Sequence, residues 1–304
     1  MRPISFERID DPAAAVAAMT AVDYSASATE PAARFIGGGT TLVDLMKLDV
    51  ARPRHLIDVS RLPRIIEFSD SYLRIGGSVR MAEAADHPQI VKEFPIIAQS
   101  LQQAASQQIR NMATLAGNVL QRTRCPYFRD VSYSACNKRS PGSGCSALDG
   151  FSRMHAVLGV SEDCIAAYPG DFAQALMALD AQVEVLGSKT AKVIPFSQIH
   201  HDVAKSPHLE TNLKADDLII AFRIPRSSIA RRSLYLKIRD RQSYAFALAS
   251  AAVCLQVGNG AIKDVRIALG GVAAKPWRAL NAEQALIGKV LDDRVATEAA
   301  EQAF

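Results

Sequence analysis

The sequence has no strong excess of charge of either sign, few aromatic residues and no long run suited to a membrane. Thirty-five Lys and Arg residues oppose 31 Asp and Glu residues, which leaves a net charge of +4, and the basic residues are scattered. A nucleic-acid partner is therefore not expected. The longest uncharged stretch, residues 242–262, contains Gln256 and the turn sequence Gly258-Asn259-Gly260. It predicts a buried core segment followed by a hairpin turn, and no membrane insertion.

The chain also lacks the short motifs of several enzyme classes. It has no Walker loop, nucleophile elbow or zinc-protease helix. Its six histidines show no metal-site spacing, and we expect them at the solvated surface. Charges and a proline at Arg2-Pro3 stand where a secretory signal would need a continuous apolar run. We therefore expect no export signal on this chain.

The order of helical and strand patterns predicts an α+β protein. Short α/β units are expected in residues 1–60, and a hairpin at 66–75. Further helices are predicted at residues 81–87, 94–107 and 171–181. We place the main boundary between residues 187 and 196. The part after it is expected to contain three strands and two helices, at residues 218–224, 233–238 and 262–269 and at residues 243–253 and 281–286.

Four of the five cysteines lie close together in the sequence, at Cys125, Cys136, Cys145 and Cys164. The segment from Gln121 to Cys164 has no clear periodicity, and a stretch of this length without regular structure requires a reason inside a compact protein. Four thiolates suit a tetrahedral zinc site or an iron–sulfur cluster. Two disulfides are the third alternative, and the spacing by itself leaves the choice open.

The residues around these cysteines favour an anionic iron–sulfur cluster. Several cations crowd the same segment: Arg122, Arg124, Arg129, Lys138, Arg139 and Arg153. Positive neighbours favour thiolates, and Gly142-Ser143-Gly144 before Cys145 lets backbone N–H groups approach sulfur. Zinc and disulfides stay open on the residues alone. The remaining cysteine, Cys254, lies in an apolar run and is expected to be a buried small hydrophobe.

Two segments offer backbone N–H groups to a bound phosphate. In the first, Gly37-Gly38-Gly39 joins an apolar strand to a predicted helix, and Thr40-Thr41 adds two hydroxyl groups. Such a strand-to-helix turn suits a pyrophosphate, although an ordinary tight turn is the alternative. The second segment, residues 110–118, places small side chains where a cofactor could approach the backbone.

Together these segments resemble the FAD-binding medium subunit of the molybdenum hydroxylases, the family of xanthine dehydrogenase, carbon monoxide dehydrogenase and aldehyde oxidoreductases. The likeness spans nearly the whole chain. The segment 36–42 resembles the first FAD loop of the family, and 113–118 resembles the second, T-I-G-G-N, with Ala116 replacing its first glycine. The resemblance implies that FAD is held by Ile36, Gly37, Gly38, Gly39, Thr40, Thr41, Leu42, Thr114, Gly117 and Asn118.

The same resemblance implies three further flavin-binding residues. The turn Pro169-Gly170-Asp171 is similar to a family turn whose aspartate contacts the flavin nucleotide. Ile219 lies in a segment that resembles the start of the C-terminal domain, and Lys237 matches a lysine near the flavin. Most members continue with Arg-Arg and Asp-Ile-Ala, where this chain has Arg239-Asp240-Arg241 and Tyr244-Ala245-Phe246-Ala247.

The resemblance also implies the domain organisation. Residues 1–190 would form a two-part FAD-binding domain of the PCMH/CO dehydrogenase flavoprotein type, with subdomains at 1–60 and 61–190. Residues 195–304 would form a C-terminal α+β domain with an antiparallel sheet, like that of the CO dehydrogenase flavoprotein.

The cysteine-rich segment, residues 121–166, is an insertion relative to most of the family. Cys125-Pro126-Tyr127-Phe128 and Cys136-Asn137-Lys138-Arg139 resemble the flavin subunit of bacterial periplasmic aldehyde oxidoreductases, which carries a [4Fe–4S] cluster. The resemblance implies that the cluster ligands are Cys125, Cys136, Cys145 and Cys164. The medium subunit of 4-hydroxybenzoyl-CoA reductase has a comparable insertion and is the nearest alternative.

The implied function is electron transfer within a heterotrimeric molybdenum enzyme that oxidises aldehydes to carboxylates. A large partner would hold the molybdenum cofactor and a small partner two [2Fe–2S] clusters, so no catalytic residue is expected on this chain. The location would be the periplasm, by export with a signal-bearing partner, or the cytoplasm. Alternatives are a xanthine dehydrogenase-like subunit, a stand-alone FAD oxidoreductase and a zinc-stapled interaction protein without flavin.

Overall fold

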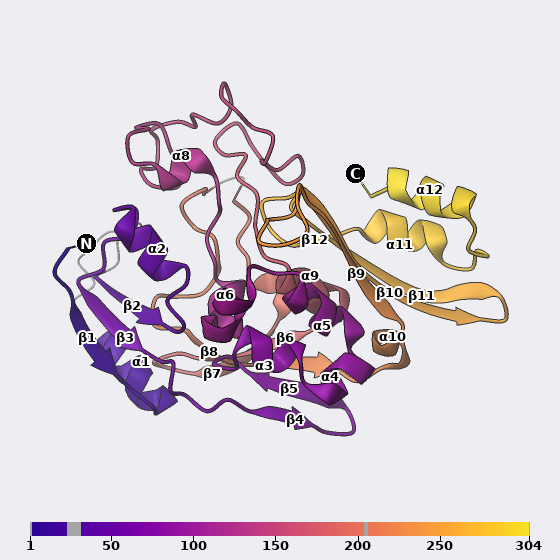
Figure 1. Ribbon diagram of the computed structural model, residues 1–304, viewed down its shortest axis with the longest axis horizontal. Helices are drawn as coiled ribbons and strands as arrows, with labels where there is room; N and C mark the ends of the chain where they lie inside the picture. Colours follow the sequence, from indigo (N-terminus) through magenta and orange to yellow (C-terminus); the bar gives the residue numbers. More distant parts are fainter. Residues whose placement is uncertain (1, 23–31, 204–205, 304) are drawn as a thin grey trace.

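The computed structural model describes residues 2–22, 32–203 and 206–303, which form three β-sheets and the helices that cover them (Figure 1). The small sheet and its two helices lie at one end, and the C-terminal sheet with the last two helices lies at the other. The central sheet and a layer of helices lie between them. None of the helices in the described ranges is long and apolar enough to span a membrane.

The small sheet confirms the α/β units predicted for the first 60 residues. Its strands are parallel, in the order β1 (Ser5–Arg8), β3 (His55–Asp58), β2 (Ala33–Ile36). Two helices accompany them, α1 (Pro12–Thr20) and α2 (Leu42–Lys47). The carboxylate of Asp11 caps α1 by accepting a hydrogen bond from the N–H of Ala14 at 2.7 Å. The crossover through α2 places the first glycine loop at the end of β2.

The central sheet contains five antiparallel strands in the order β4-β5-β8-β6-β7. Their bounds are β4 (Ile66–Phe68), β5 (Tyr72–Gly76), β8 (Leu218–Pro225), β6 (Gln182–Leu186) and β7 (Ala191–Pro195). The hairpin predicted at residues 66–75 is present as β4 and β5. The boundary expected at residues 190–195 falls before β8, which pairs with both β5 and β6. The central sheet therefore contains β8, a strand that the sequence analysis assigned to the C-terminal part.

Helices pack on the central sheet and enclose the largest apolar core. They are α3 (Met81–Ala85), α4 (Pro88–Glu93), α5 (Pro95–Gln102), α6 (Gln107–Met112), α7 (Leu115–Val119) and α9 (Phe172–Ala178). The helix predicted at residues 94–107 is present as α5 but ends earlier, at Gln102, and α6 begins separately at Gln107, where the hydroxyl of Ser106 accepts a hydrogen bond from the N–H of Ile109. Phe94, Phe172 and Phe222 are fully buried between this layer and the sheet.

The C-terminal sheet is antiparallel, as expected, with the order β12-β11-β10-β9. Its strands are β9 (Ser233–Ile238), β10 (Ala249–Gly258), β11 (Ala261–Gly270) and β12 (Trp277–Arg278). The predicted helix at residues 243–253 is wrong, because residues 249–253 of this alanine-rich segment form the first half of β10, between β9 and β11. Ser250, Ala252 and Cys254 are buried at alternate positions, so pairing and burial override helix propensity.

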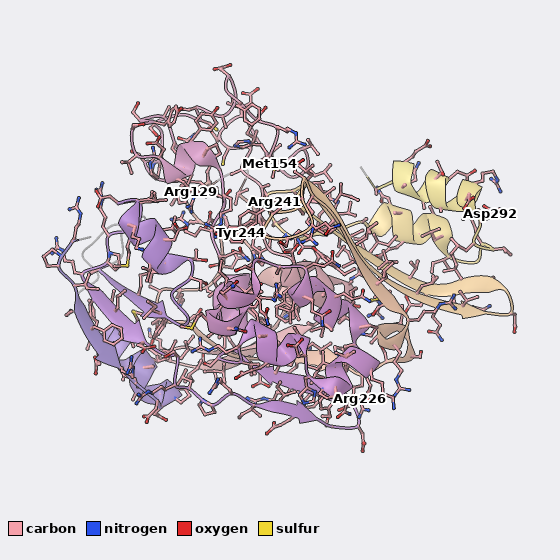
Figure 2. The ribbon with its side chains drawn as sticks, in the orientation of Figure 1. Arg129, Met154, Arg226, Arg241, Tyr244 and Asp292 are labelled. Atoms are coloured by element: carbon pink, nitrogen blue, oxygen red, sulfur yellow. The ribbon has the colours of Figure 1, made fainter. Side chains whose placement is uncertain are left out.

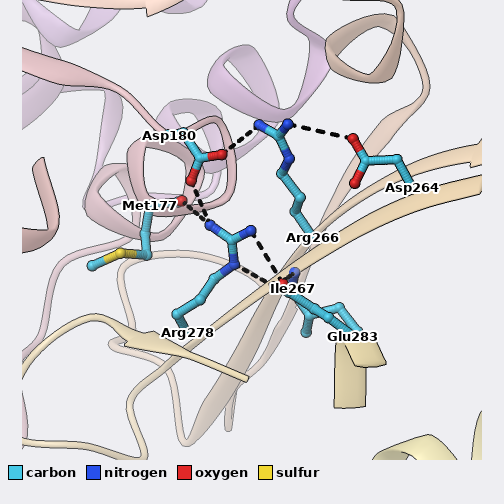
Figure 3. Close-up of polar contacts among 7 residues, drawn as sticks. All are labelled: Met177, Asp180, Asp264, Arg266, Ile267, Arg278 and Glu283. Carbon is cyan, nitrogen blue, oxygen red and sulfur yellow. Dashed lines mark hydrogen bonds and ion pairs between the residues drawn. The ribbon is translucent and has the colours of Figure 1, made fainter. Parts of the chain in front are cut away.

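Three short helices belong to this part of the chain, α10 (Ser228–Arg231), α11 (Leu280–Leu286) and α12 (Asp293–Glu301). The last two pack on β11 through a separate apolar cluster that includes Val265, Leu286 and Val295. A network of ion pairs joins the C-terminal sheet to the end of α9 (Figure 3). Asp180 accepts from Arg266 at 2.6 Å and from Arg278 at 2.7 Å. This network ties the C-terminal sheet to Asp180, which lies just after α9.

The insertion forms a lobe above the helical layer and has one short helix, α8 (Pro126–Arg129) (Figure 1). A single 3-10 turn, η1 (Phe196–Gln198), follows the central hairpin later in the chain. Elsewhere the insertion is built from turns and isolated bridges, as its lack of periodicity predicts.

Candidate functional site

The two predicted flavin loops lie directly against each other. A Cβ atom added to Gly37 would lie 2.6 Å from Oγ1 of Thr114, and one added to Gly38 would overlap the carbonyl oxygen of Met112. Within the second loop, Oγ1 of Thr114 accepts a hydrogen bond from the N–H of Gly117 at 3.2 Å. Only glycine permits this approach of the two backbones. The structure therefore brings segments 36–42 and 113–118 together into one site.

The remaining loop residues surround this contact. Ile36 is the last residue of β2, and Gly39 to Leu42 form the turn into α2, where the N–H of Val43 donates to the carbonyl oxygen of Gly39 at 3.0 Å. Ile219 lies on β8 behind the second loop. Its carbonyl oxygen abuts Gly77, whose own carbonyl oxygen accepts from the N–H of Ala116 at 2.9 Å.

The loops fit a bound FAD in two respects. Their facing glycines leave backbone uncovered by side chains, which suits close approach of a pyrophosphate. The side-chain Oδ1 of Asn118 is buried and has no hydrogen-bond partner among the described residues. A buried polar atom without a partner is costly in a folded protein, so a ligand that donates to it would relieve this cost.

Asp171 and Lys237 form a buried ion pair, with Nζ of Lys237 2.8 Å from Oδ2 of Asp171. Tyr235 donates its hydroxyl hydrogen to Oδ1 of the same carboxylate at 2.6 Å, and Lys237 also donates to the carbonyl oxygen of Gln103 at 3.1 Å. Burial raises the pKa of Asp171, against the lowering effect of Lys237. These side chains join the start of α9 to β9. Tyr235 was not identified from the sequence as part of this group. Tyr235 lies two residues before Lys237, so the two side chains share one face of a strand, and this spacing was the available signal.

The four clustered cysteines come together in the insertion. Cys136 and Cys145 face each other in an antiparallel bridge, and Cys136 and Cys164 are buried. Cys125 and Cys164 each experience the charge of two other members of the group, Cys136 among them. All five cysteines are free thiols, so the alternative of two disulfides is not what the structure contains. Cys254 is fully buried in β10, as predicted.

Burial shifts the pKa of two of these thiols. It raises the pKa of Cys125 to about 11 and also raises the pKa of Cys164, where Lys138 opposes the effect. The protonated thiol form is therefore favoured at these two positions. In the ranges 2–22, 32–203 and 206–303, no three His, Cys, Asp or Glu side chains are gathered around a point suited to one metal ion.

Most of the cations near the cysteines have carboxylate partners. Arg124 and Arg129 both pair with Asp44 of α2 at 2.9 Å. Arg129 is labelled in Figure 2. Arg122 and Lys138 pair with Glu210 at 2.7 and 3.1 Å. These ion pairs attach the insertion to the rest of the protein. Lys138 also acts to lower the pKa of the Cys164 thiol against the effect of burial, in the direction expected of a cationic neighbour.

Two histidines lie in the interior, contrary to the prediction of a solvated surface. Nε2 of His155 lies 3.2 Å from Sγ of Cys125, and its side chain contributes to the same buried region. His200 is enclosed by the rings of Tyr168 and Phe196, and burial lowers its pKa to about 4. His155 lies between the third and fourth cysteines in the sequence, and that place in the chain was a signal that it belongs to the cysteine group.

A pocket of about 360 Å³ lies between the insertion, the turn before α9 and the loop that joins β9 to β10. Cys125 and His155 form part of its wall, together with Arg124, whose guanidinium lies over the ring of Phe246 at 4.9 Å. Met154, labelled in Figure 2, also lines it. Nε of Arg124 and Nδ1 of His155 are buried without partners among the described residues. Apolar walls with a few convergent polar atoms are typical of pockets that take planar cofactors or substrates.

Comparison with known proteins identifies the family of this chain. Residues 12–227 match the family described as "FAD binding domain in molybdopterin dehydrogenase", and residues 234–303 match "CO dehydrogenase flavoprotein C-terminal domain". The chain is 47% identical to the aldehyde oxidoreductase FAD-binding subunit PaoB of Escherichia coli K12, over 91% of this chain and 84% of that protein. It is 28% identical to the nicotine 6-hydroxylase medium subunit of Paenarthrobacter nicotinovorans, over 90% and 79% of the two chains.

A solved structure has the same fold. The carbon monoxide dehydrogenase of Hydrogenophaga pseudoflava superposes with a TM-score of 0.74 at 21% identity, covering 99% of this chain and 86% of that one. The two family matches together cover most of the sequence, and the Escherichia coli relative is similar over nearly all of it. The chain therefore belongs to the FAD-binding medium subunits of the molybdenum hydroxylases, and it is an oxidoreductase subunit of the aldehyde oxidoreductase type.

Proposed function

We propose that this chain is the FAD- and [4Fe–4S]-binding electron-transfer subunit of a heterotrimeric molybdenum enzyme that oxidises aldehydes to carboxylates. The observation that carries the proposal is the contact of the two glycine loops, where Gly38 meets the carbonyl oxygen of Met112. This contact assembles backbone from two distant segments into one cradle. The likeness to the aldehyde oxidoreductase FAD-binding subunit PaoB supports the choice of enzyme class.

The cradle holds the pyrophosphate of FAD, and each loop has its own role. Gly37 to Thr41 offer backbone N–H groups and hydroxyl groups, while Asn118 offers its unpartnered Oδ1 to a donor on the cofactor. FAD, when bound, supplies an electron carrier that accepts and releases one or two electrons. The buried pair of Asp171 and Lys237 fixes the start of α9 against β9.

The insertion holds the iron–sulfur cluster through Cys125, Cys136, Cys145 and Cys164. Four free thiols in one lobe, two of them buried, are the donor set that such a cluster requires. The pocket lined by Cys125 lies on the side of the lobe that faces the turn before α9. The protein keeps water away from the sulfur of Cys136 and Cys164 by burying both.

Substrate chemistry belongs to partner chains in this proposal. A large subunit carries the molybdenum cofactor, and a small subunit carries two [2Fe–2S] clusters that deliver electrons to the flavin. Several relatives are described as medium subunits or medium chains, which supports an assembly of three kinds of chain. The flavin subunit then passes the electrons to an external acceptor.

The visible absorption spectrum of anaerobically purified protein tests the proposal. We expect flavin bands and a broad iron–sulfur absorption, both of which bleach with dithionite. Cys136→Ala should remove the broad absorption and the iron but keep the flavin bands, and Cys254→Ala is the matched control that changes neither. Zinc in place of iron would refute the cluster assignment. Protein without flavin bands, or a single chain that oxidises aldehydes alone, would refute the subunit assignment.

A further inference from the structure

Arg80 lies where the two glycine loops and α3 meet, and neither loop motif includes it. Its guanidinium Nη1 donates a hydrogen bond to the carbonyl oxygen of Met112, the same oxygen that a Cβ on Gly38 would overlap. The backbone around it is held as well. Arg80 pairs with Thr114 in an antiparallel bridge, and the N–H of Met81 donates to the carbonyl oxygen of Ala113 at 2.9 Å.

We propose that Arg80 is a positioning residue for the diphosphate of FAD. The proposal rests on the assignment of the diphosphate to the two loops. The carbonyl oxygen of Met112 presents the negative end of its dipole to Gly38, in the region where a phosphate must bind. The hydrogen bond from Arg80 offsets that negative charge and fixes the direction of the carbonyl group. Arg80 thereby removes a repulsion and holds the second loop against the first.

The charges around Arg80 leave its own charge available to the site. Glu83 accepts the backbone N–H of Arg80 at 3.0 Å with Oε2, and its Oε1 pairs with Arg64 at 2.6 Å. Asp58, the other nearby carboxylate, pairs with Arg8 at 2.7 Å. Across the described parts of the chain, no carboxylate lies within ion-pair distance of the Arg80 guanidinium. The positive charge is therefore shared between the Met112 carbonyl and whatever anion occupies the cradle.

Binding of three ligands distinguishes a role of Arg80 at the diphosphate from a general role in stabilising the fold. FAD contains the diphosphate and the flavin ring, ADP contains the diphosphate without that ring, and riboflavin contains the ring without phosphate. With the full chain freed of flavin, Arg80→Ala should weaken FAD and ADP binding about tenfold or more, because a charge-assisted hydrogen bond is lost. Riboflavin binding should change less than twofold. The affinity of the variant for FAD should also depend less steeply on salt.

Two further variants complete the test. Arg80→Gln retains an amide donor for Met112 and removes the charge, so it should fold and still lose affinity for FAD and ADP. Arg64→Ala, which removes a neighbouring arginine that pairs with Glu83, should leave FAD affinity within twofold. Equal losses for riboflavin and FAD, or unchanged FAD affinity in Arg80→Gln, would overturn the proposal. Failure of the unmodified chain to bind FAD would instead refute the proposed function.

Discussion

Replacement of Gly38 by alanine tests whether contact between the two loops, and not the turn alone, requires glycine. The new Cβ would overlap the carbonyl oxygen of Met112. That carbonyl cannot easily yield, because Arg80 donates to it and the next residue, Ala113, donates its N–H to the carbonyl oxygen of Ile109 at 2.8 Å. One loop must therefore move away from the other. Overpacking of this kind costs about 1–3 kcal/mol.

If the cost falls on cofactor binding, the affinity for FAD drops by about 5- to 150-fold, since each 1.4 kcal/mol is a factor of ten. The assay is a fluorescence titration of flavin-free protein with FAD. Gly258→Ala is the matched control, because its Cβ would meet only the flexible side chain of Lys263, with Cγ at 3.2 Å. Affinity within twofold of the unmodified protein in both variants would show that the loops adjust freely, and the reasoning from their contact would fail.

Three further predictions concern stability. If the cluster only holds the insertion together, Cys136→Ser should lower the melting temperature and abolish bound iron while flavin reduction rates persist; a slowed rate in folded protein would contradict that structural role. Arg122 and Lys138 outweigh burial and lower the pKa of Glu210 from 4.5 to about 2, so its charged form stabilises the fold above pH 4.5 and this contribution is lost as the pH falls toward 2. Glu210→Gln should flatten the melting-temperature profile in that window, and parallel profiles would disprove it. Arg278→Ala should cost about 3 kcal/mol in urea unfolding, because Glu283 keeps its charge in a largely buried position, and a loss no larger than that of Arg266→Ala would refute this.

Local patterns in the sequence predicted much of the fold. Apolar segments predicted β2 and β3 of the small sheet, and alternation predicted the β4–β5 hairpin, and these elements are present; β1 was not predicted. The segment at residues 243–253 failed, because its alanines suit a helix in isolation. Their place between two strands made every second residue a buried one, and that environment is set by β9 and β11.

The residues of a strand and their sequence neighbours also do not determine which sheet the strand joins. The apolar run of β8 predicted a strand correctly, yet its partners β5 and β6 come from segments far away in the chain. Strand pairing depends on which edges remain free once the other elements have packed. The sequence by itself contains no local signal for that choice.

The sequence by itself determined the chemistry available to this protein, namely two loops with exposed backbone and four grouped thiols. Residue type and spacing suffice for this, because they decide which donors and acceptors a segment can offer. Only the tertiary structure decided how those groups are used. It placed Gly38 against Met112, paired Asp171 with Lys237, and tied Arg122 and Lys138 to Glu210. Such contacts join residues distant in the chain, and they form because burial leaves each charged or polar group in need of a partner.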